Sequence, residues 1–388
     1  MAKMQVLTYK YRLLPTRKQH EALTAILDSQ RTLYNAALEE RIGSYRATGN
    51  SRTYVDQCAA LTECRRDLPE MTALPLSIQR GTLRRLDEAY KAFFRRAKSR
   101  KGKAGFPRFR GKGWFNSFEF NEFRGIRFDG KRLRWVGVPS GLRVHLHRKM
   151  PGGKILTAKF KRDHKGWSVC LAVRVDAPEK RVVTSAVGID VGIKTLAATS
   201  DGLLIPNPRA ARRAERELRR RQRALARCKR GSNRRRKVRA QVTRCHAKVT
   251  NTRMTSLHQI SAMLVRRYDV IAVEALNVKG LSRGILARDV RDASWSKLVD
   301  LISYKAARAG KHLIKVDPKY TSQTCPECDS VKAKTLAERV HECACGYVAD
   351  RDVAAARVIL SRAGMGPGIG NVGQWAVRRS GKLMEVTK

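Results

Sequence analysis

The first hundred residues change from a strand-like to a helix-like pattern of hydrophobic positions. Apolar and basic residues alternate through VLTYKYRLL, so the first 15 residues are predicted to contain a strand. Thr16 is followed three residues later by Gln19, the pairing of a capping box, which predicts that a helix begins there. Apolar residues then recur at helical spacing in two stripes, at Leu23, Ile26, Leu27, Leu33, Tyr34, Ala37, Leu38 and Ile42, and at Ile78, Leu86, Tyr90, Phe93 and Ala97. Residues 16–100 are therefore predicted to form a helical domain.

Residues 101–182 carry the pattern of short strands. LRVHLHR, ILTAKFKR and WSVCLAVRV alternate around glycine-rich turns, which predicts a small β-barrel or sandwich to which residues 1–15 would add a strand. The stretch leading into them mixes glycines and basic residues with aromatic rings at Phe106, Phe109, Trp114, Phe115, Phe118, Phe120 and Phe123. Such rings either fill a strand core or stack on unpaired bases beside phosphate-binding cations. We expect the core for most of them, and the composition also suits a nucleic-acid surface.

After residue 183 the pattern alternates between strands and helices. TSAVGIDVGIKTLAATSDG predicts a hairpin and DVIAVEAL a buried strand at 269–276. A helix near 294–309 and another strand, HLIKVDPKYT at 312–321, are predicted to follow. VADRDVAAARVIL predicts a further helix that Asp350 or Asp352 would open. This alternation implies an α/β layer architecture.

The net charge of the chain points to a polyanionic partner. The 388 residues are 42% hydrophobic, enough for globular cores, but 82 Lys and Arg against 33 Asp and Glu give a net charge of +49. Nucleic acid is the expected neutralising partner. Residues 209–253 hold 19 Lys or Arg and two Glu, which favours a helical hairpin lying on phosphates over a merely solvated face.

Membrane partners and disulfides are not expected. No run approaches the roughly 18 consecutive apolar residues that span a bilayer. The N-terminal MAKMQVLTYKYRLLPT lacks the apolar core of a signal peptide, so a cytoplasmic protein is expected. In a reducing compartment, close pairs among the nine cysteines favour metal binding.

Four cysteines have the spacing of a structural zinc site. Cys325 and Cys328 form a C-x-x-C pair, and Cys343 and Cys345 a tighter C-x-C pair. Four thiolates close a tetrahedral site around Zn²⁺ and leave no position for a catalytic water. His341 is near enough in sequence to be an alternative ligand.

Two carboxylates interrupt apolar strands, where a charge is costly. Asp190 lies in VGIDVGI and Glu274 in IAVEAL. A buried carboxylate needs a partner or becomes protonated, and the partner is either an arginine or a metal ion. With Asp352 as a third acid the balance moves towards metal, although an acid at a helix N-terminus is also a common cap. Three such ligands suit two Mg²⁺ ions about 3.5 to 4 Å apart on a phosphodiester.

These segments, taken in order, resemble the motifs of the TnpB family of transposon-encoded nucleases, which is related to type V CRISPR effectors. They are GIDVGIKTLAATSDG, IAVEALNVKGL, SWSKLVDLISYKAARAGKHLIKVDPKYTSQTCPECDS and CACGYVADRDVAAARVIL, with YKYRLLPTRKQHEAL and PRFRGKGWFNSFEF in front. The resemblance implies a multidomain α+β protein with a β-rich wedge domain, a helical recognition domain and an RNase H-like (RuvC) nuclease domain that carries an inserted zinc finger. The implied bounds are 1–15 and 101–182 for the wedge, 16–100 for recognition, 183–320 and 348–362 for the nuclease, 321–347 for the zinc finger and 363–388 for a flexible tail.

The resemblance also implies an activity and its residues. A guide RNA would select double-stranded target DNA beside a short adjacent motif, and a bacterial, nucleoid-associated monomer with its RNA would cut it with Mg²⁺. By motif, Asp190, Glu274 and Asp352 match the three RuvC acids, and Cys325, Cys328, Cys343 and Cys345 the zinc ligands. Asp352 is preferred to Asp350 because DVAAA aligns with the family pattern D-x-N-A-A, although Ala354 stands where asparagine is usual. A compact type V CRISPR effector, a nuclease-dead RNA-guided repressor and a strand-joining transposase remain as alternatives.

Overall fold

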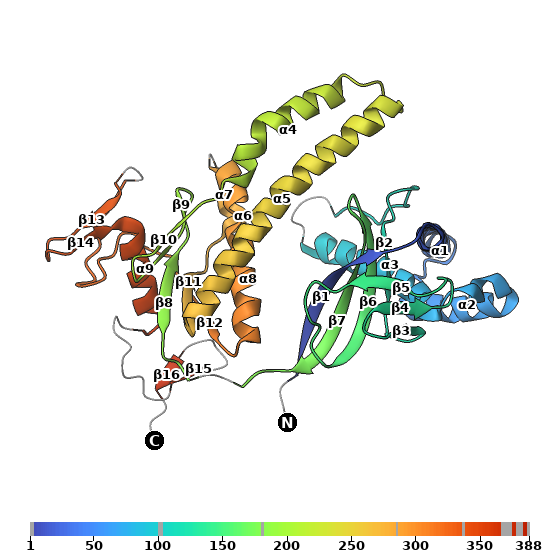
Figure 1. Ribbon diagram of the computed structural model, residues 1–388, viewed down its shortest axis with the longest axis horizontal. Helices are drawn as coiled ribbons and strands as arrows, with labels where there is room; N and C mark the ends of the chain where they lie inside the picture. Colours follow the sequence, from blue (N-terminus) through green and yellow to red (C-terminus); the bar gives the residue numbers. More distant parts are fainter. Residues whose placement is uncertain are drawn as a thin grey trace. The chain divides into compact units, whose positions relative to one another are not determined.

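The computed structural model describes residues 4–99, 104–179, 182–284, 286–335 and 338–365, together with two short strands near the C-terminus (Figure 1). The chain divides into two compact units, Met1–Ala177 and Pro178–Lys388. Within the described ranges, no helix combines the length and the apolar character needed to cross a membrane.

The first unit is built on one antiparallel sheet. Its seven strands follow the order β2-β6-β7-β1-β5-β4-β3, so the expected barrel or sandwich is a single sheet in the described residues. The N-terminal strand pairs with β7 on one side and with β5 on the other, as the first 15 residues predicted. The strands are β1 (Met4–Leu14), β2 (Ser117–Phe120), β3 (Ile126–Phe128), β4 (Arg132–Trp135), β5 (Leu142–His145), β6 (Lys154–Asp163) and β7 (Gly166–Asp176).

In the described part of this unit, three α-helices and a 3₁₀ turn pack against the sheet in one hydrophobic core. The predicted capping box is present, because Thr16 and Gln19 each accept a hydrogen bond from the other's backbone N–H. The first apolar stripe is buried or half-buried throughout, whereas Ala97 of the second is exposed because the last turns of the third helix extend beyond the core. The elements are α1 (Arg17–Thr48), α2 (Tyr54–Asp67), η1 (Pro69–Ala73) and α3 (Leu76–Ser99).

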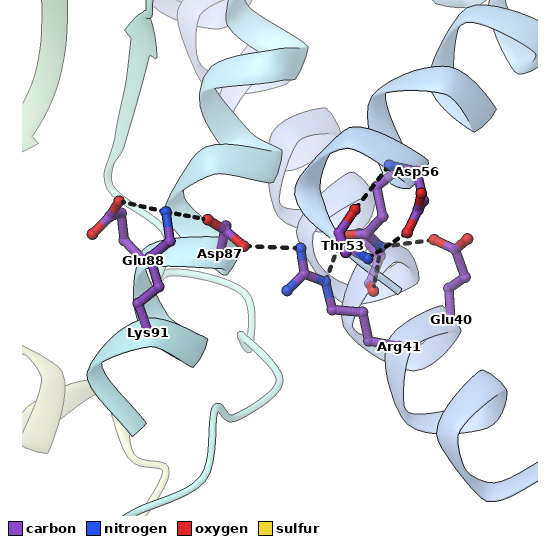
Figure 2. A network of polar contacts seen from close by, with 9 residues as sticks. Glu40, Arg41, Thr53, Asp56, Asp87, Glu88 and Lys91 are labelled. Carbon is purple, nitrogen blue, oxygen red and sulfur yellow. Dashed lines mark hydrogen bonds and ion pairs between the residues drawn. The ribbon is translucent and has the colours of Figure 1, made fainter. Parts of the chain in front are cut away.

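A buried arginine joins the three helices (Figure 2). Arg41 of α1 donates from Nε to Gln57 of α2 at 2.8 Å and from Nη2 to Asp87 of α3 at 3.3 Å. Lys91 reaches the other oxygen of Asp87 at 2.8 Å. The buried guanidinium is thus both paired and hydrogen-bonded, which offsets the cost of removing it from water.

The second unit contains a mixed sheet with helices on both faces. Its strand order is β10-β9-β8-β11-β12, with β8, β11 and β12 parallel and β9 and β10 antiparallel. The predicted α/β layering is therefore confirmed. The strands are β8 (Ala186–Asp190), β9 (Thr195–Thr199), β10 (Leu204–Pro206), β11 (Val270–Glu274) and β12 (His312–Val316).

Different helices cover the two faces of this sheet. Ile189 and Val273 pack against Leu257 of α5 and Leu298 of α8, while Ala272 packs on the opposite face in the core that α9 completes. The basic stretch forms a hairpin, with α4 and α5 lying side by side (Figure 1). The helices are α4 (Ala210–Ala226), α5 (Asn233–Arg267), α6 (Val278–Leu281), α7 (Ala287–Ala293), α8 (Trp295–Arg308) and α9 (Arg351–Arg362).

The C-terminal segment 363–388, expected to be a flexible tail, falls largely outside the described residues. Within it, β15 (Trp375–Val377) and β16 (Leu383–Glu385) pair antiparallel.

Asp269, at the start of β11, is expected to make the second unit sensitive to acid. Burial alone would raise its pKa, but hydrogen bonds from Thr184 and the ammonium of Lys311, 3.2 Å away, lower the pKa to about 2. A carboxyl whose pKa is lower in the folded state stabilises the fold above its unfolded pKa of about 4. That contribution is lost as the pH falls from about 4 towards 2.

Asp269→Asn should therefore lower the free energy of unfolding by about 2 kcal/mol at neutral pH. Urea denaturation of both proteins at several pH values measures the difference, which should shrink below pH 4. Asp289→Asn on α7 is the control and should change stability by less than about 0.5 kcal/mol. A difference that stays constant down to pH 2 would refute the assignment.

Candidate functional site

Asp190 and Glu274 end two neighbouring parallel strands. The register of β8 and β11 pairs Ile189 with Val273, so the two acids follow directly at the carboxyl edge of the sheet. Successive side chains on a strand alternate between faces. Because Ile189 and Val273 belong to the core on the α5 and α8 side, both acids lie on the face that α9 covers.

Helix α9 approaches this face closely because Gly188 has no side chain. A Cβ at Gly188 would lie 1.9 Å from the carbonyl oxygen of Ala356, in the middle of α9. At Gly192, in the turn after β8, a Cβ would lie 3.9 Å from Oδ2 of Asp352. The first turn of α9 therefore brings Asp352 to the turn that follows Asp190.

The structure gives Asp350 and Asp352 different surroundings. Asp350 is the N-cap of α9, and its Oδ1 accepts hydrogen bonds from the backbone N–H groups of Asp352 at 2.9 Å and Val353 at 3.2 Å. Asp350 is exposed, whereas the Asp352 side chain is only 19% exposed and lies 3.5 Å from Nε of Arg351. Asp352 is also one of the charges that raise the pKa of Asp190, whereas the Asp350 carboxylate is occupied as the N-cap of α9.

Glu274 and Asp352 both act on the carboxyl of Asp190 when they are ionised. Burial, followed by the charges of Glu274 and Asp352, raises the pKa of Asp190 to about 8. Burial also raises the pKa of Glu274, against a hydrogen bond from Thr321 and the charge of Arg362. A divalent cation among the carboxylates would relieve this repulsion and displace the proton. Carboxylate oxygens are ligands that Mg²⁺ accepts, so the donor set fits the metal.

Sequence patterns did not single out three further residues beside these acids. Thr321 donates a hydrogen bond from Oγ1 to Glu274. Trp295 donates from Nε1 to the carbonyl of Gly192 at 3.0 Å and so holds the turn after Asp190. Arg351 lies between Asp352 and the carbonyl oxygen of Thr335. These three residues have no local sequence signal. Gly188, a glycine inside an apolar strand, does have one, because such a glycine often marks a place where another backbone packs closely, as α9 does here.

The four predicted zinc cysteines come together in the structure. Their sulfur atoms all lie within 4.8 Å of one another, and no other such cluster of His, Cys, Asp or Glu occurs in the described ranges. Sγ atoms of Cys325 and Cys345 are 3.7 Å apart, and those of Cys328 and Cys343 are 3.5 Å apart. Tetrahedral Zn²⁺ with bonds of about 2.3 Å separates its sulfurs by about 3.8 Å, so the cluster fits zinc.

The cysteines lie on two tight turns between β12 and α9. The second turn joins β13 (Val340–Glu342) to β14 (Val348–Asp350), and Gly346, at a φ of +89°, donates to the carbonyl of Cys343. His341, the alternative ligand, lies outside the cluster. Its ring is buried against Tyr347, with Nδ1 in contact with Lys334.

The seven aromatic rings of residues 106–123 divide into two groups. Phe115, Phe118 and Phe120 are buried and Phe123 is half-buried, whereas Phe106, Phe109 and Trp114 are 47%, 56% and 69% exposed. The exposed rings lie in residues 104–114, before the first strand of that region. Asn35 fixes this segment through two hydrogen bonds to the backbone of Arg110, and Arg96 donates to the carbonyls of residues 104 and 105.

Comparison with known proteins agrees with the motifs. Family models match residues 168–284 ("Probable transposase"), 295–359 ("Cas12f1-like, TNB domain") and 4–50 ("Helix-turn-helix domain"). A Streptomyces pristinaespiralis protein named "Putative RNA-guided DNA endonuclease" is 33% identical over 363 residues, which cover 91% of this chain and 88% of that protein. The chain belongs to the TnpB family. The resemblance seen in the motifs is thereby confirmed.

Two more distant proteins resemble this TnpB-family chain along most of its length. A protein of Escherichia coli K12 named "Putative RNA-guided DNA endonuclease InsQ" is 25% identical over 377 residues, which cover 91% of each chain. The protein in a structure of a Cas12f1-sgRNA-target DNA complex has a TM-score of 0.57 and 14% identity, and the match covers 89% of this chain and 83% of that one. At this identity the likeness shows a shared mixed α/β fold.

Proposed function

We propose that this TnpB-family chain is an RNA-guided DNA endonuclease of an insertion sequence, which cuts target DNA beside a short adjacent motif by two-metal-ion hydrolysis. The observation that carries the proposal is that Asp190 and Glu274 end neighbouring parallel strands and that Asp352 reaches the turn after Asp190. The family relatives named as RNA-guided DNA endonucleases support it.

The second unit is proposed to be an RNase H-like (RuvC) nuclease domain with an inserted zinc finger. Its mixed five-stranded sheet places β8 and β11 in parallel, so that acids distant in sequence share one edge. The cysteine cluster lies between β12 and α9 and would hold one structural Zn²⁺, which returns the chain to the helix carrying Asp352.

Each acid has a proposed role in cleavage. Two bound Mg²⁺ ions would supply an activated water and stabilise the leaving oxygen. Asp190, between the other two acids, would hold both cations, while Glu274 and Asp352 would each complete one coordination shell. Trp295 fixes the turn beside Asp190 through the carbonyl of Gly192. This arrangement needs no side-chain nucleophile.

The basic hairpin is proposed to hold nucleic acid by its phosphates. The first five residues of α5 include no acidic residue, and four of them are Arg234, Arg235, Arg236 and Lys237. Cations at a helix N-terminus oppose the helix dipole, so this end favours a bound anion. Sequence-indifferent phosphate contacts suit a protein whose target is selected by base pairing with a guide.

Neutralising this end of the hairpin should weaken RNA binding in a salt-dependent way. The triple variant Arg234→Gln, Arg236→Gln and Lys237→Gln removes exposed charges and should reduce the slope of log affinity against log salt by about two. Filter binding of the co-purified RNA at several salt concentrations measures the slope. A variant that exchanges the same arginines for lysine and Lys237 for arginine keeps the charge and should keep the slope. Equal slopes for all three proteins would exclude the hairpin from the interface.

Sequencing the RNA that co-purifies from the native host tests the guided function against its alternatives. A guide transcribed from the transposon end supports the proposal, whereas a repeat-derived guide indicates a compact CRISPR effector. DNA binding without cleavage in Mg²⁺ would indicate a nuclease-dead repressor. Joined strands instead of free cut ends would indicate a transposase.

A further inference from the structure

Glu274 receives one hydrogen bond from the described part of the chain, and Thr321 donates it. The Oγ1 hydroxyl of Thr321 contacts Oε1 of Glu274, and Thr321 is 4% exposed. The carbonyl oxygen of Pro318, 3.1 Å from Oγ1, is a second acceptor for the same proton, and an ionised carboxylate is the stronger of the two acceptors. The other carboxylate oxygen, Oε2, accepts no hydrogen bond from a described residue. A glutamate at the edge of a sheet can turn about its side-chain torsions, and a donor fixed to one oxygen limits that rotation.

The backbone that carries Thr321 is itself anchored. Arg362, at the end of α9, donates from Nη1 to the carbonyl oxygens of Asp317 at 3.0 Å and Lys319 at 2.6 Å. On the other side, Cys325 of the zinc cluster follows Thr321 after three residues and donates its backbone N–H to Ser330. The hydroxyl is therefore held in place from both directions along the chain.

We propose that Thr321 is a positioning residue, which fixes Glu274 through Oε1 and leaves Oε2 for the catalytic cation that Glu274 would share with Asp190. The inference rests on the proposed nuclease function. Partners that orient a metal ligand typically change metal affinity or activity 10- to 100-fold when they are removed. Because the loop of Thr321 leads directly into the cysteine cluster, the same contact joins the zinc site to a catalytic carboxylate.

Three substitutions separate this role from a general effect on the loop. Thr321→Val keeps the shape of the side chain and removes the donor, and Thr321→Ser restores the hydroxyl. Thr324→Val is the matched control, because Thr324 is also buried in this loop and donates its hydroxyl to the carbonyl of Tyr320 at 2.8 Å.

Metal binding is measured directly on the full chain. Mn²⁺ replaces Mg²⁺ as a probe for carboxylate ligands. Electron paramagnetic resonance measures the concentration of free Mn²⁺. Binding that remains in Glu274→Ala is subtracted, which leaves the Glu274-dependent binding. Thr321→Val should weaken the Glu274-dependent Mn²⁺ binding by about 10-fold or more. Thr321→Ser and Thr324→Val should bind as the wild type does. The Mg²⁺ concentration for half-maximal cleavage should likewise rise for Thr321→Val and stay at the wild-type value for Thr321→Ser and Thr324→Val.

The outcomes distinguish the inference from the function on which it rests. Wild-type Mn²⁺ affinity in Thr321→Val, an equal loss in Thr324→Val, or no recovery in Thr321→Ser would overturn the positioning role. Absence of cleavage by the wild-type protein with RNA and Mg²⁺ would instead refute the nuclease. Cleavage by the wild type together with a selective loss in Thr321→Val supports both.

Discussion

Asp190→Ala should abolish DNA cleavage while RNA and DNA binding persist. Asp190 lies at the carboxyl edge of β8, where the charges of Glu274 and Asp352 act on it, and in the proposed site it would hold both cations. Its removal should lower the single-turnover cleavage rate by about 1,000-fold or more, as for other groups that act as a unit in catalysis. Labelled target DNA and the RNA-loaded protein provide the assay, with gel shifts for binding. Undiminished cleavage by the variant would show that the site is misassigned.

The neighbouring acids of α9 provide a matched pair for the same assay. Asp352→Ala should lose cleavage as Asp190→Ala does, because its side chain lies beside the turn after β8. Asp350→Ala should keep cleavage and lower stability by about 1 kcal/mol, since it removes the N-cap of α9. The reverse result would make Asp350 the ligand.

Loss of the zinc site is the second large effect expected. Cys325→Ser should reduce bound zinc from one ion per chain to none, because Cys325 is the buried member of the four-sulfur cluster. Structural zinc sites contribute on the order of 10 kcal/mol of binding free energy that is also folding free energy. Residues 321–335 and 338–350 should consequently lose protection from hydrogen exchange, and Thr321 should lose its fixed position beside Glu274. Elemental analysis and hydrogen exchange measure the two effects.

Cys245→Ser is the control for that experiment. Cys245 lies on α5, outside the cluster, and its replacement should leave zinc content and exchange unchanged. Retention of zinc by Cys325→Ser, or equal loss in both variants, would contradict a four-cysteine site.

Local chemistry made the individual elements of the fold predictable. The capping box at Thr16 and the apolar runs around Asp190 and Glu274 each depend on residues close in sequence. The cysteine cluster was likewise predictable from spacing alone, because two short cysteine pairs on tight turns can close one tetrahedral site.

Contacts between distant segments were not predictable in the same way. The hydrogen bond from Thr321 to Glu274 spans 47 positions and depends on how the loop after β12 folds back. The first backbone N–H groups of α4 donate to Asp292 of α7, whereas the side chain at the N-cap position of α4, Arg209, makes no capping hydrogen bond. The burial of some aromatic rings and the exposure of Phe106, Phe109 and Trp114 depend on where β2 begins. Sequence spacing contains none of this information.

Cleavage of a plasmid matched to the co-purified RNA tests the central claim most directly. The plasmid would carry the guide-complementary sequence beside a randomised flank, and a second plasmid would carry a scrambled target. The wild-type protein with its RNA and Mg²⁺ should linearise only the matched plasmid, and the cut molecules should share a short flanking motif. Cutting of both plasmids alike, or no cutting of the matched plasmid by the RNA-loaded protein, would contradict RNA-guided cleavage.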